Sequence, residues 1–223
     1  MNNQNKTAVI TGISSGIGLA LAKKLLAENF NVIGTTRSGV LNDFQNDNLE
    51  VVALDATDKG SVASAISRIA ELTKGIDLVI NNAGAAPDIF DVTPEINAFN
   101  QTIATNITGV VFFNEPLLEI IKDGGQIVFI SSQMGLPRNA DVTGTAYCMS
   151  KAAINMYAVI LAKRLAERNI KVTPVHPGWV QTKLGGDQAP LTPEQSAEGI
   201  YNGIADMESG RFYNITIPGT EDF

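Results

Sequence analysis

Short runs rich in β-branched residues alternate with longer helical patterns along most of this chain of 223 residues. The apolar residues of the short runs are nearly continuous, which is typical of strands covered on both faces, as in parallel sheets. Alternation at this spacing predicts βαβ crossovers, and therefore an α/β fold with a doubly wound parallel sheet of about seven strands and helices on both faces. The expected strands are Thr7–Thr11, Asn31–Thr36, Leu49–Leu54, Ile76–Asn81, Gln126–Ser131, Lys171–Val175 and, more weakly, Phe212–Ile215.

The helical patterns carry their own start and stop signals. Thr192 is a suitable N-cap for the last helix, because Pro193 follows at the first helical position. Pro116 lies inside the third pattern and is expected to kink or split that helix, since it lacks a donor and clashes with the preceding turn. The expected helices are Ile17–Asn29, Lys59–Thr73, Glu95–Lys122, Ala146–Arg168 and Thr192–Met207.

Composition excludes several classes of protein. Apolar residues make up 44% of the chain and charged residues 17%, which is incompatible with intrinsic disorder. Cys148 is the only cysteine, so a disulfide scaffold is excluded and a reducing compartment is favoured. The net charge of −7 argues against a nucleic-acid partner. The first six residues are polar and the longest apolar run, Gly109–Phe113, is too short for a membrane helix, so we expect a cytoplasmic protein without membrane contact.

A glycine-rich turn joins the first expected strand to the first helix. Gly12, Gly16 and Gly18 would let the backbone turn tightly, approach a pyrophosphate and pack the helix close to the sheet. Backbone N–H groups and the helix dipole point at such a turn and suit an anion. The expected cofactor-binding residues of this turn are Gly12, Ser14, Ser15, Gly16, Ile17 and Gly18. The alternative is an ordinary flexible turn.

The end of the second strand discriminates between dinucleotides. An acid there suits a ribose 2′-hydroxyl, whereas a cation suits a 2′-phosphate. This chain has Arg37 followed by Ser38 and no acid, which favours NADP(H) over NAD(H). A solvated arginine at a strand end is the alternative interpretation.

Two further strand ends carry polar residues. Asp55 is a candidate for an adenine amino group, although Asp55 or Thr57 also fits as the cap of the next helix. Asn82, in the run Asn81-Asn82-Ala83-Gly84, suits a chain segment that passes close to a ligand, and a simple Asx turn is the alternative.

Tyr147 and Lys151 are four residues apart at the start of a helix and therefore share one face. An ammonium beside a phenol favours the phenolate and lowers the tyrosine pKa, which makes Tyr147 a candidate general acid or base. Ser131 and Ser132 end the fifth strand, at the sheet edge where this helix begins. The sequence therefore predicts a catalytic cluster at that edge.

These motifs, in this order, resemble the short-chain dehydrogenase/reductase family over nearly the whole chain. The resemblance implies a single Rossmann-type domain over residues 1–223. It is strongest to the C-factor and sniffer-type carbonyl reductase branch, through the segment from Pro177 to Glu194. The matching residues are Gly12, Gly16, Gly18, Asn81 to Gly84, Asn106, Ser132, Tyr147, Lys151, Pro177 and Gly178.

The resemblance also implies roles. Tyr147 would donate the proton to a carbonyl oxygen, Lys151 would lower its pKa and bind the nicotinamide ribose, and Ser132 would hold the substrate oxygen. Ser132 is preferred to Ser131 because it stands three residues before Gly135. Asn106 would hold a water that links Lys151 to bulk solvent. The cofactor contacts implied after the sixth strand are Pro177, Gly178, Val180 and Thr182.

The implied activity is NADP(H)-dependent interconversion of a small-molecule carbonyl and an alcohol. The alternatives are a dinucleotide-binding signalling protein of C-factor type and a 3-oxoacyl carrier-protein reductase. Family members commonly dimerise through the third and fourth long helices, so a homodimer or homotetramer is expected. The sequence has no cluster with metal-ligand spacing, so no metal is expected.

Two segments depart from the family pattern. The loop Gly135–Thr145 is slightly long and carries Arg138 and Asp141, which are either substrate-pocket residues or part of a solvated loop. The end of the chain, Ile215–Phe223, either closes the pocket or frays.

Three single residues invite a functional interpretation, His176 and Cys148 as catalytic groups and Trp179 as part of a binding cleft. His176 ends a buried strand and is expected to be structural, and Cys148 is expected to pack. Trp179 fits equally a wall of the cleft or the core.

Overall fold

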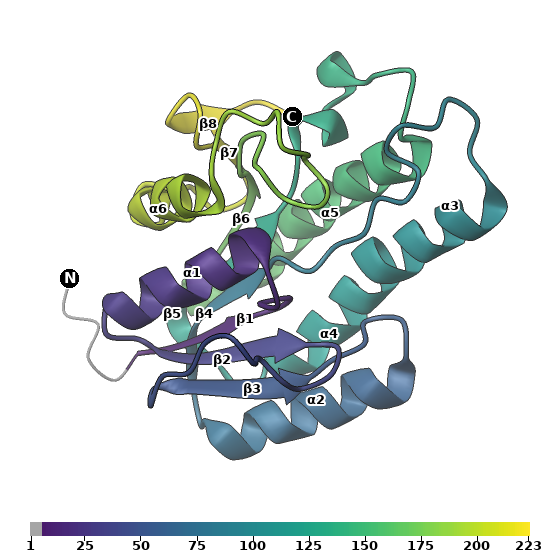
Figure 1. Ribbon diagram of the computed structural model, residues 1–223. Coiled ribbons are helices and arrows are strands. Elements are labelled where there is room, and N and C mark those ends of the chain that lie inside the picture. Colours follow the sequence, from purple (N-terminus) through teal and green to yellow (C-terminus); the bar gives the residue numbers. More distant parts are fainter. Residues whose placement is uncertain (1–5) are drawn as a thin grey trace.

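The structure, a computed structural model, describes residues 6–223, and most of the polar stretch at the start of the sequence, residues 1–5, lies outside that range. Its centre is an eight-stranded sheet in the order β3-β2-β1-β4-β5-β6-β7-β8 (Figure 1). Neighbouring strands are parallel except for β8, which runs antiparallel to β7. The strands are β1 Thr7–Ile10, β2 Asn31–Thr36, β3 Leu49–Ala53, β4 Ile76–Asn81, β5 Ile121–Ile130, β6 Lys171–His176, β7 Phe212–Asn214 and β8 Gly219–Glu221.

Helices cover both faces of the sheet, as the sequence predicts. Helices α1 and α6 pack together on one face, and α2, α4 and α5 lie on the other (Figure 1). Each layer closes over its own apolar core, with Leu21 and Ile200 under the first pair and Phe113 and Leu161 under the second group. The helices are α1 Gly16–Ala27, α2 Lys59–Leu72, α3 Ile96–Ile103, α4 Val110–Leu117, α5 Thr145–Arg164 and α6 Pro193–Gly203.

The third expected helix differs from the prediction. A π-helical segment, Ala104–Gly109, interrupts it between α3 and α4, so the irregularity lies well before Pro116. Pro116 stands in the last turn of α4, and the helix ends one residue later at Leu117, so the proline marks the end of the helix and does not kink its middle. Residues 121 and 122, expected as the end of that helix, and residues 123–125, expected as neither helix nor strand, belong to β5. Ile121 pairs with Ile76 before the register shifts.

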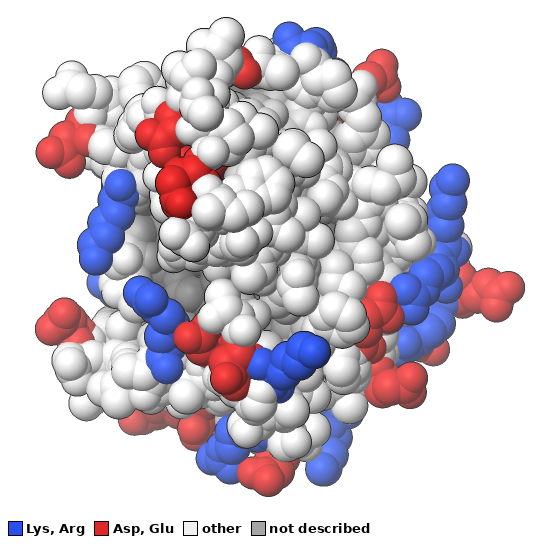
Figure 2. Space-filling model, turned by 90° about the vertical axis from the view of Figure 1, so that its right-hand side faces the viewer, with Lys and Arg blue, Asp and Glu red and all other residues white. Residues whose placement is uncertain are grey.

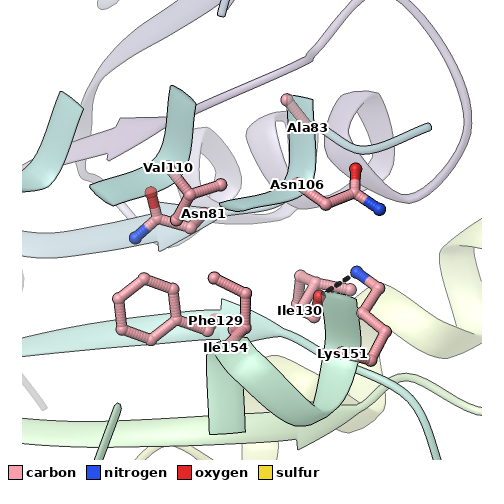
Figure 3. Close-up of a pocket in the computed structure, with 8 residues that line it drawn as sticks. All are labelled: Asn81, Ala83, Asn106, Val110, Phe129, Ile130, Lys151 and Ile154. Atoms are coloured by element: carbon pink, nitrogen blue, oxygen red, sulfur yellow. Dashed lines mark hydrogen bonds between the residues drawn. The ribbon is translucent and has the colours of Figure 1, made fainter. Parts of the chain in front are cut away.

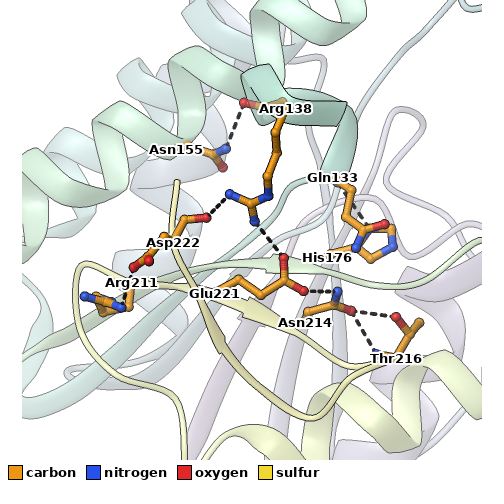
Figure 4. A network of polar contacts seen from close by, with 10 residues as sticks. Gln133, Arg138, Asn155, His176, Arg211, Asn214, Thr216, Glu221 and Asp222 are labelled. Carbon is orange, nitrogen blue, oxygen red and sulfur yellow. Dashed lines mark hydrogen bonds and ion pairs between the residues drawn. The ribbon is translucent and has the colours of Figure 1, made fainter. Parts of the chain in front are cut away.

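The end of the chain is ordered rather than frayed. Residues 219–221 form β8 on β7. The Arg138 guanidinium donates to a Glu221 carboxylate oxygen at 2.8 Å and to the Asp222 carbonyl (Figure 4). The other Glu221 oxygen accepts from Asn214 at 2.6 Å, and Arg211 pairs with the Asp222 side chain. Arg138 is therefore not a free solvated residue. Its charge is paired with Glu221 and is not available to a ligand.

Replacing Arg138 by Ala should loosen β8 with little effect on the whole domain. The side chains of the pair are 43% and 22% exposed, so the pair contributes at most about 1 kcal/mol. We expect faster amide exchange at residues 219–222 and a nearly unchanged melting temperature. Arg68→Ala is the matched control, since it breaks an exposed pair with Glu71 inside α2. Unchanged exchange at 219–222 would show that Arg138 does not anchor the strand.

Within residues 6–223, no helix combines the length and apolar character needed to cross a membrane. The same residues contain no group of three or more His, Cys, Asp or Glu side chains placed to hold a metal ion.

Candidate active site

The glycine turn after β1 adopts backbone conformations that require glycine. Gly12 and Gly16 have φ of +74° and +60°, in the left-handed region that other residues rarely enter. A Cβ on Gly18 would lie 2.2 Å from the Gly12 carbonyl oxygen. The turn is anchored to β2, because Gly12 N–H donates to the Thr35 hydroxyl and Ile13 N–H to its carbonyl.

The N-terminus of α1 opens from this turn without a protein anion. Ser15 is the N-cap but makes no side-chain capping bond, and the first turn carries no acidic residue. Ser14 and Ser15 are exposed, and Ile17 is partly exposed. The segment after β6 comes close, since a Cβ on Gly16 would lie 3.1 Å from the Thr182 methyl group. Free N–H groups, glycines and Thr182 together fit a phosphate group.

Asn82 does not point freely into the site. Its amide donates to the carbonyls of Thr11 and Gly12, at 3.0 and 3.1 Å, so its side chain fixes the glycine turn to β4. Asp55 likewise is occupied locally. It accepts from the N–H and hydroxyl of Thr57, at 2.9 and 2.7 Å.

The cap of α2 is neither of the expected residues. Asp58 holds that position and accepts from Ser61 N–H at 2.6 Å, so the prediction that Asp55 or Thr57 caps the helix is wrong. Asp55 and Thr57 instead hydrogen-bond to each other within the turn that precedes Asp58.

Arg37 stands at the end of β2 with an exposed side chain. Its charge is close enough to Asp55 to contribute to lowering the pKa of that carboxyl group, after the larger effect of the bonds from Thr57. Arg37 and Asp55 therefore flank the carboxyl ends of β2 and β3, on the same sheet edge as the glycine turn.

Ser132, Tyr147 and Lys151 meet at the carboxyl end of β5. The Ser132 hydroxyl accepts from Met134 N–H at 3.1 Å and lies close enough to the Tyr147 phenol to offset part of the rise that burial causes in the phenol pKa, and both residues are buried. The Lys151 ammonium lies 5.5 Å from the centre of the Tyr147 ring and donates to the Ile130 carbonyl at 2.7 Å. Ser131 is turned elsewhere, since its hydroxyl bonds to Asn155 at 2.6 Å.

Burial dominates the electrostatics of this cluster. It raises the pKa of Tyr147 to about 12, and the neighbouring Ser132 hydroxyl offsets only part of that shift. It lowers the pKa of Lys151 to about 8. The expected depression of the tyrosine pKa by lysine is therefore absent in the chain alone, because the ammonium is held by Ile130 rather than by the phenol oxygen. At neutral pH the phenol carries its proton.

Asn106 lies in the π-helical segment, 2% exposed. Its side-chain oxygen accepts from Ala85 N–H, and its amide donates to the Ala85 carbonyl and to Ser150, all within 3.0 Å. A cavity of about 10 Å³ separates Asn106 from Lys151, which face each other across it (Figure 3). The cavity is lined by Asn81, Ala83, Asn106, Val110, Phe129, Ile130, Lys151 and Ile154.

Two residues important to this geometry are missing from the sequence predictions. Ser150 donates to the carbonyl of Tyr147 at 2.7 Å, and Asp88 accepts from the N–H groups of Ala146 and Tyr147. Ser150 is identifiable only by its place inside the Tyr147–Lys151 turn. Asp88 carries no sequence signal, since its partners lie 58 and 59 residues away.

His176 is structural, as expected. Its Nδ1 accepts from the Gln133 N–H at 3.4 Å, and burial lowers its pKa to about 4. Cys148 is partly buried, and burial raises its thiol pKa, so a nucleophilic role is not supported.

Trp179 does not belong to the core, being 56% exposed. Its indole donates to the Gly185 carbonyl. Together with Leu191 and Ile215 it lines a groove of about 440 Å³ beside the β6–α6 connection.

Comparison with known proteins identifies the family. The model of the family described as short chain dehydrogenase matches residues 6–190. The chain belongs to the short-chain dehydrogenase family. It is therefore an oxidoreductase with the fold described above, and the members of this family typically act on small molecules.

A curated relative, the 3-oxoacyl-[acyl-carrier-protein] reductase FabG of Vibrio harveyi, is 30% identical over 190 residues, covering 82% of this chain and 77% of the relative. Two solved structures share the fold at 24% identity and a TM-score of 0.88. The carbonyl reductase Sniffer of D. melanogaster covers 99% of this chain and 100% of its own. The NADPH-bound carbonyl reductase from chicken fatty liver covers 99% and 95%.

Proposed function

We propose that this protein is an NADP(H)-dependent oxidoreductase that interconverts a carbonyl and an alcohol. The observation that carries the proposal is the cluster of Ser132, Tyr147 and Lys151, buried together at one sheet edge with the Lys151 ammonium 5.5 Å from the centre of the Tyr147 ring. A protonated phenol beside a hydroxyl suits donation of a proton to a carbonyl oxygen that the serine also holds.

When bound, the nicotinamide supplies the hydride for reduction or accepts it in oxidation. Tyr147 gives its proton to the substrate oxygen, and Ser132 donates a hydrogen bond to the same atom. Lys151, whose ammonium lies 5.5 Å from the centre of the Tyr147 ring and donates to the Ile130 carbonyl, is assigned to the nicotinamide ribose. Asn106 and Lys151 border a cavity the size of one water molecule, which supports a route by which the phenol regains its proton.

The residues around the glycine turn fit a dinucleotide. A Cβ at Gly18 would collide with backbone, and the N-terminus of α1 has no capping side chain among the described residues. We assign the cofactor to Gly12, Ser14, Ser15, Gly16, Ile17 and Gly18, to Arg37, Asp55 and Asn82, to Tyr147 and Lys151, and to Pro177, Gly178, Val180 and Thr182. Asn82 contributes by holding the turn in shape.

The preference for NADP(H) rests on Arg37, and the chicken enzyme with this fold binds NADPH. Arg37→Asp should lower the apparent affinity for NADPH by on the order of tenfold or more, because a 2′-phosphate loses a charge-assisted bond and meets a like charge. Affinity for NADH should stay the same or rise. Titrations of both cofactors with wild type and variant measure this. A wild type that binds NADH more tightly than NADPH contradicts the assignment.

The name of the Vibrio harveyi relative favours a second candidate, reduction of a 3-oxoacyl group on a carrier protein. Such a carrier would need a basic docking surface near the site. The sequence offers only Arg138 and Lys183 near the site, and Arg138 is paired with Glu221. We therefore favour small free carbonyl compounds. A purely regulatory dinucleotide-binding role leaves the Ser132–Tyr147–Lys151 cluster without a purpose.

We further infer that the protein acts as a cytoplasmic homodimer or homotetramer. Helices α4 and α5 expose large apolar side chains, at Phe112, Met149, Met156 and Ile160. Figure 2 shows a broad area without charged side chains at the centre of the face that includes α3 and α5, with acidic and basic residues around it. Light scattering of the purified protein measures the oligomeric state.

The decisive assay uses purified protein with NADPH and a panel of aldehydes, ketones and one 3-oxoacyl thioester. The proposal predicts NADPH oxidation with at least one free carbonyl compound. Turnover with the thioester alone would favour the second candidate, and no turnover with any compound would favour the regulatory role.

A further inference from the structure

Helix α5 carries Tyr147 and Lys151 but has no cap of its own. Its N-cap position is Gly144, in the left-handed conformation with φ of +66°, and no side chain at that position can accept a bond. The first turn also lacks an acidic residue. A helix N-terminus leaves N–H groups unpaired, and burying them without partners is costly.

Asp88, from the loop between β4 and α3, takes over that function. One carboxylate oxygen accepts from Ala146 N–H at 2.7 Å and from Tyr147 N–H at 3.3 Å. The other oxygen accepts from the Thr102 hydroxyl of α3 at 3.2 Å. Asp88 is fully buried, so these bonds are not shared with solvent, and its negative charge faces the positive end of α5.

Side chains bind both backbone polar groups of Tyr147. Its N–H is bound by Asp88, while its carbonyl accepts from Ser150 at 2.7 Å. Ser150 in turn accepts from Asn106 at 3.0 Å. The loop that contains Asp88 is tied to the helix start a second time, through the bond from Gly144 N–H to the Asp91 carbonyl at 3.1 Å.

We propose that Asp88 is a positioning residue for Tyr147: it sets the place of the first turn of α5 and thereby the place of the phenol relative to Ser132. The inference rests on the proposed function. It identifies Asp88 as a further residue on which the rate depends, in addition to Ser132, Tyr147, Lys151 and Asn106. Asp88 touches neither the phenol nor the substrate oxygen, and it acts through the backbone of α5.

The test compares Asp88→Ala and Asp88→Ser, which withdraw the carboxylate, with Asp88→Asn, which keeps an acceptor oxygen in place. Misplacement of a catalytic group by about 1 Å lowers rates by about 100-fold, so the Ala and Ser variants should lose about 10–100-fold in kcat. Their affinity for NADPH, followed by quenching of Trp179 fluorescence, should change little. Asp88→Asn should recover most of the lost kcat.

Amide exchange provides a measurement that does not depend on turnover. In Asp88→Ala, the amides of residues 146–148 should exchange faster, while those of β1 and β4 stay protected. The matched control is Glu95→Ala. Glu95 lies at the end of the same loop and caps α3 through Asn97 and Ala98, with an exposed side chain. This control should lower the melting temperature without lowering kcat.

The outcomes are distinguishable. A wild type without NADPH-dependent turnover would overturn the proposed function, and the exchange data would still test the cap. With an active wild type, Ala and Ser variants that keep the wild-type kcat would overturn the positioning role. So would failure of both to fold, or equal losses of kcat and cofactor affinity, because either would make Asp88 a residue of general stability.

Discussion

Tyr147→Phe should lower kcat for carbonyl reduction by about 10²–10⁴-fold, the range over which a positioned general acid contributes. The substitution removes only the phenol oxygen, whose pKa burial raises and the nearby Ser132 hydroxyl partly lowers. The ring and its contacts within the buried first turn of α5 remain. Binding of NADPH and the melting temperature should therefore stay close to those of the wild type.

The matched control for this variant is Tyr157→Phe on the same helix. The Tyr157 hydroxyl donates to Glu115 at 3.0 Å, on the side of α5 that faces α4, away from Ser132. It should keep the wild-type kcat. Full activity in Tyr147→Phe, or an equal loss in both variants, would contradict the role given to Tyr147.

Gly18→Ala should weaken cofactor binding more than any other single methyl addition in the turn. The new Cβ would lie 2.2 Å from the Gly12 carbonyl oxygen and 2.4 Å from the Asn82 amide nitrogen. Relief of that contact must move the turn away from α1 or break the bonds from Asn82. Overpacking of this kind costs about 1–3 kcal/mol, which corresponds to roughly 5–150-fold in NADPH affinity if it falls on binding.

Gly60→Ala is the control for the added methyl group. Gly60 lies in the first turn of α2, where a Cβ would meet only the Asp58 carboxylate at 3.2 Å. Calorimetric titration with NADPH should show no change for Gly60→Ala and a clear loss for Gly18→Ala. Equal affinities for the two variants would contradict the assignment of the turn to the cofactor.

The layers of the fold follow from the sequence because apolar runs and helical periodicity report burial directly. The region from Ile103 to Gln126 is the exception. Its apolar pattern continues through a π-helical segment, a helix end at Leu117 and the start of β5 at Ile121. The spacing of the apolar residues does not change at these transitions, because helix and strand bury the same residues there. Strand β8 escapes prediction because three half-buried residues have no periodicity.

The candidate site likewise contains features that the sequence predicts and features that it does not. Positions fixed by local chemistry, such as Gly12, Gly16 and the Tyr147–Lys151 pair, are visible in the sequence. Interactions between distant residues are not: the bonds of Asn82 to the glycine turn span 70 residues or more, and those of Asp88 to α5 nearly 60. Electrostatics also depends on burial, which is why the pKa of Tyr147 rises where the local pair suggests a fall.

Hydride transfer to a carbonyl carbon is the central claim, and isotopic labelling tests it most directly. NADPH deuterated at C4 of the nicotinamide, prepared separately with the label on each face, is incubated with the protein and a carbonyl compound that it reduces. Mass spectrometry of the product should show one deuterium on the carbinol carbon with one of the two labelled cofactors. A product without deuterium from either cofactor would contradict the account.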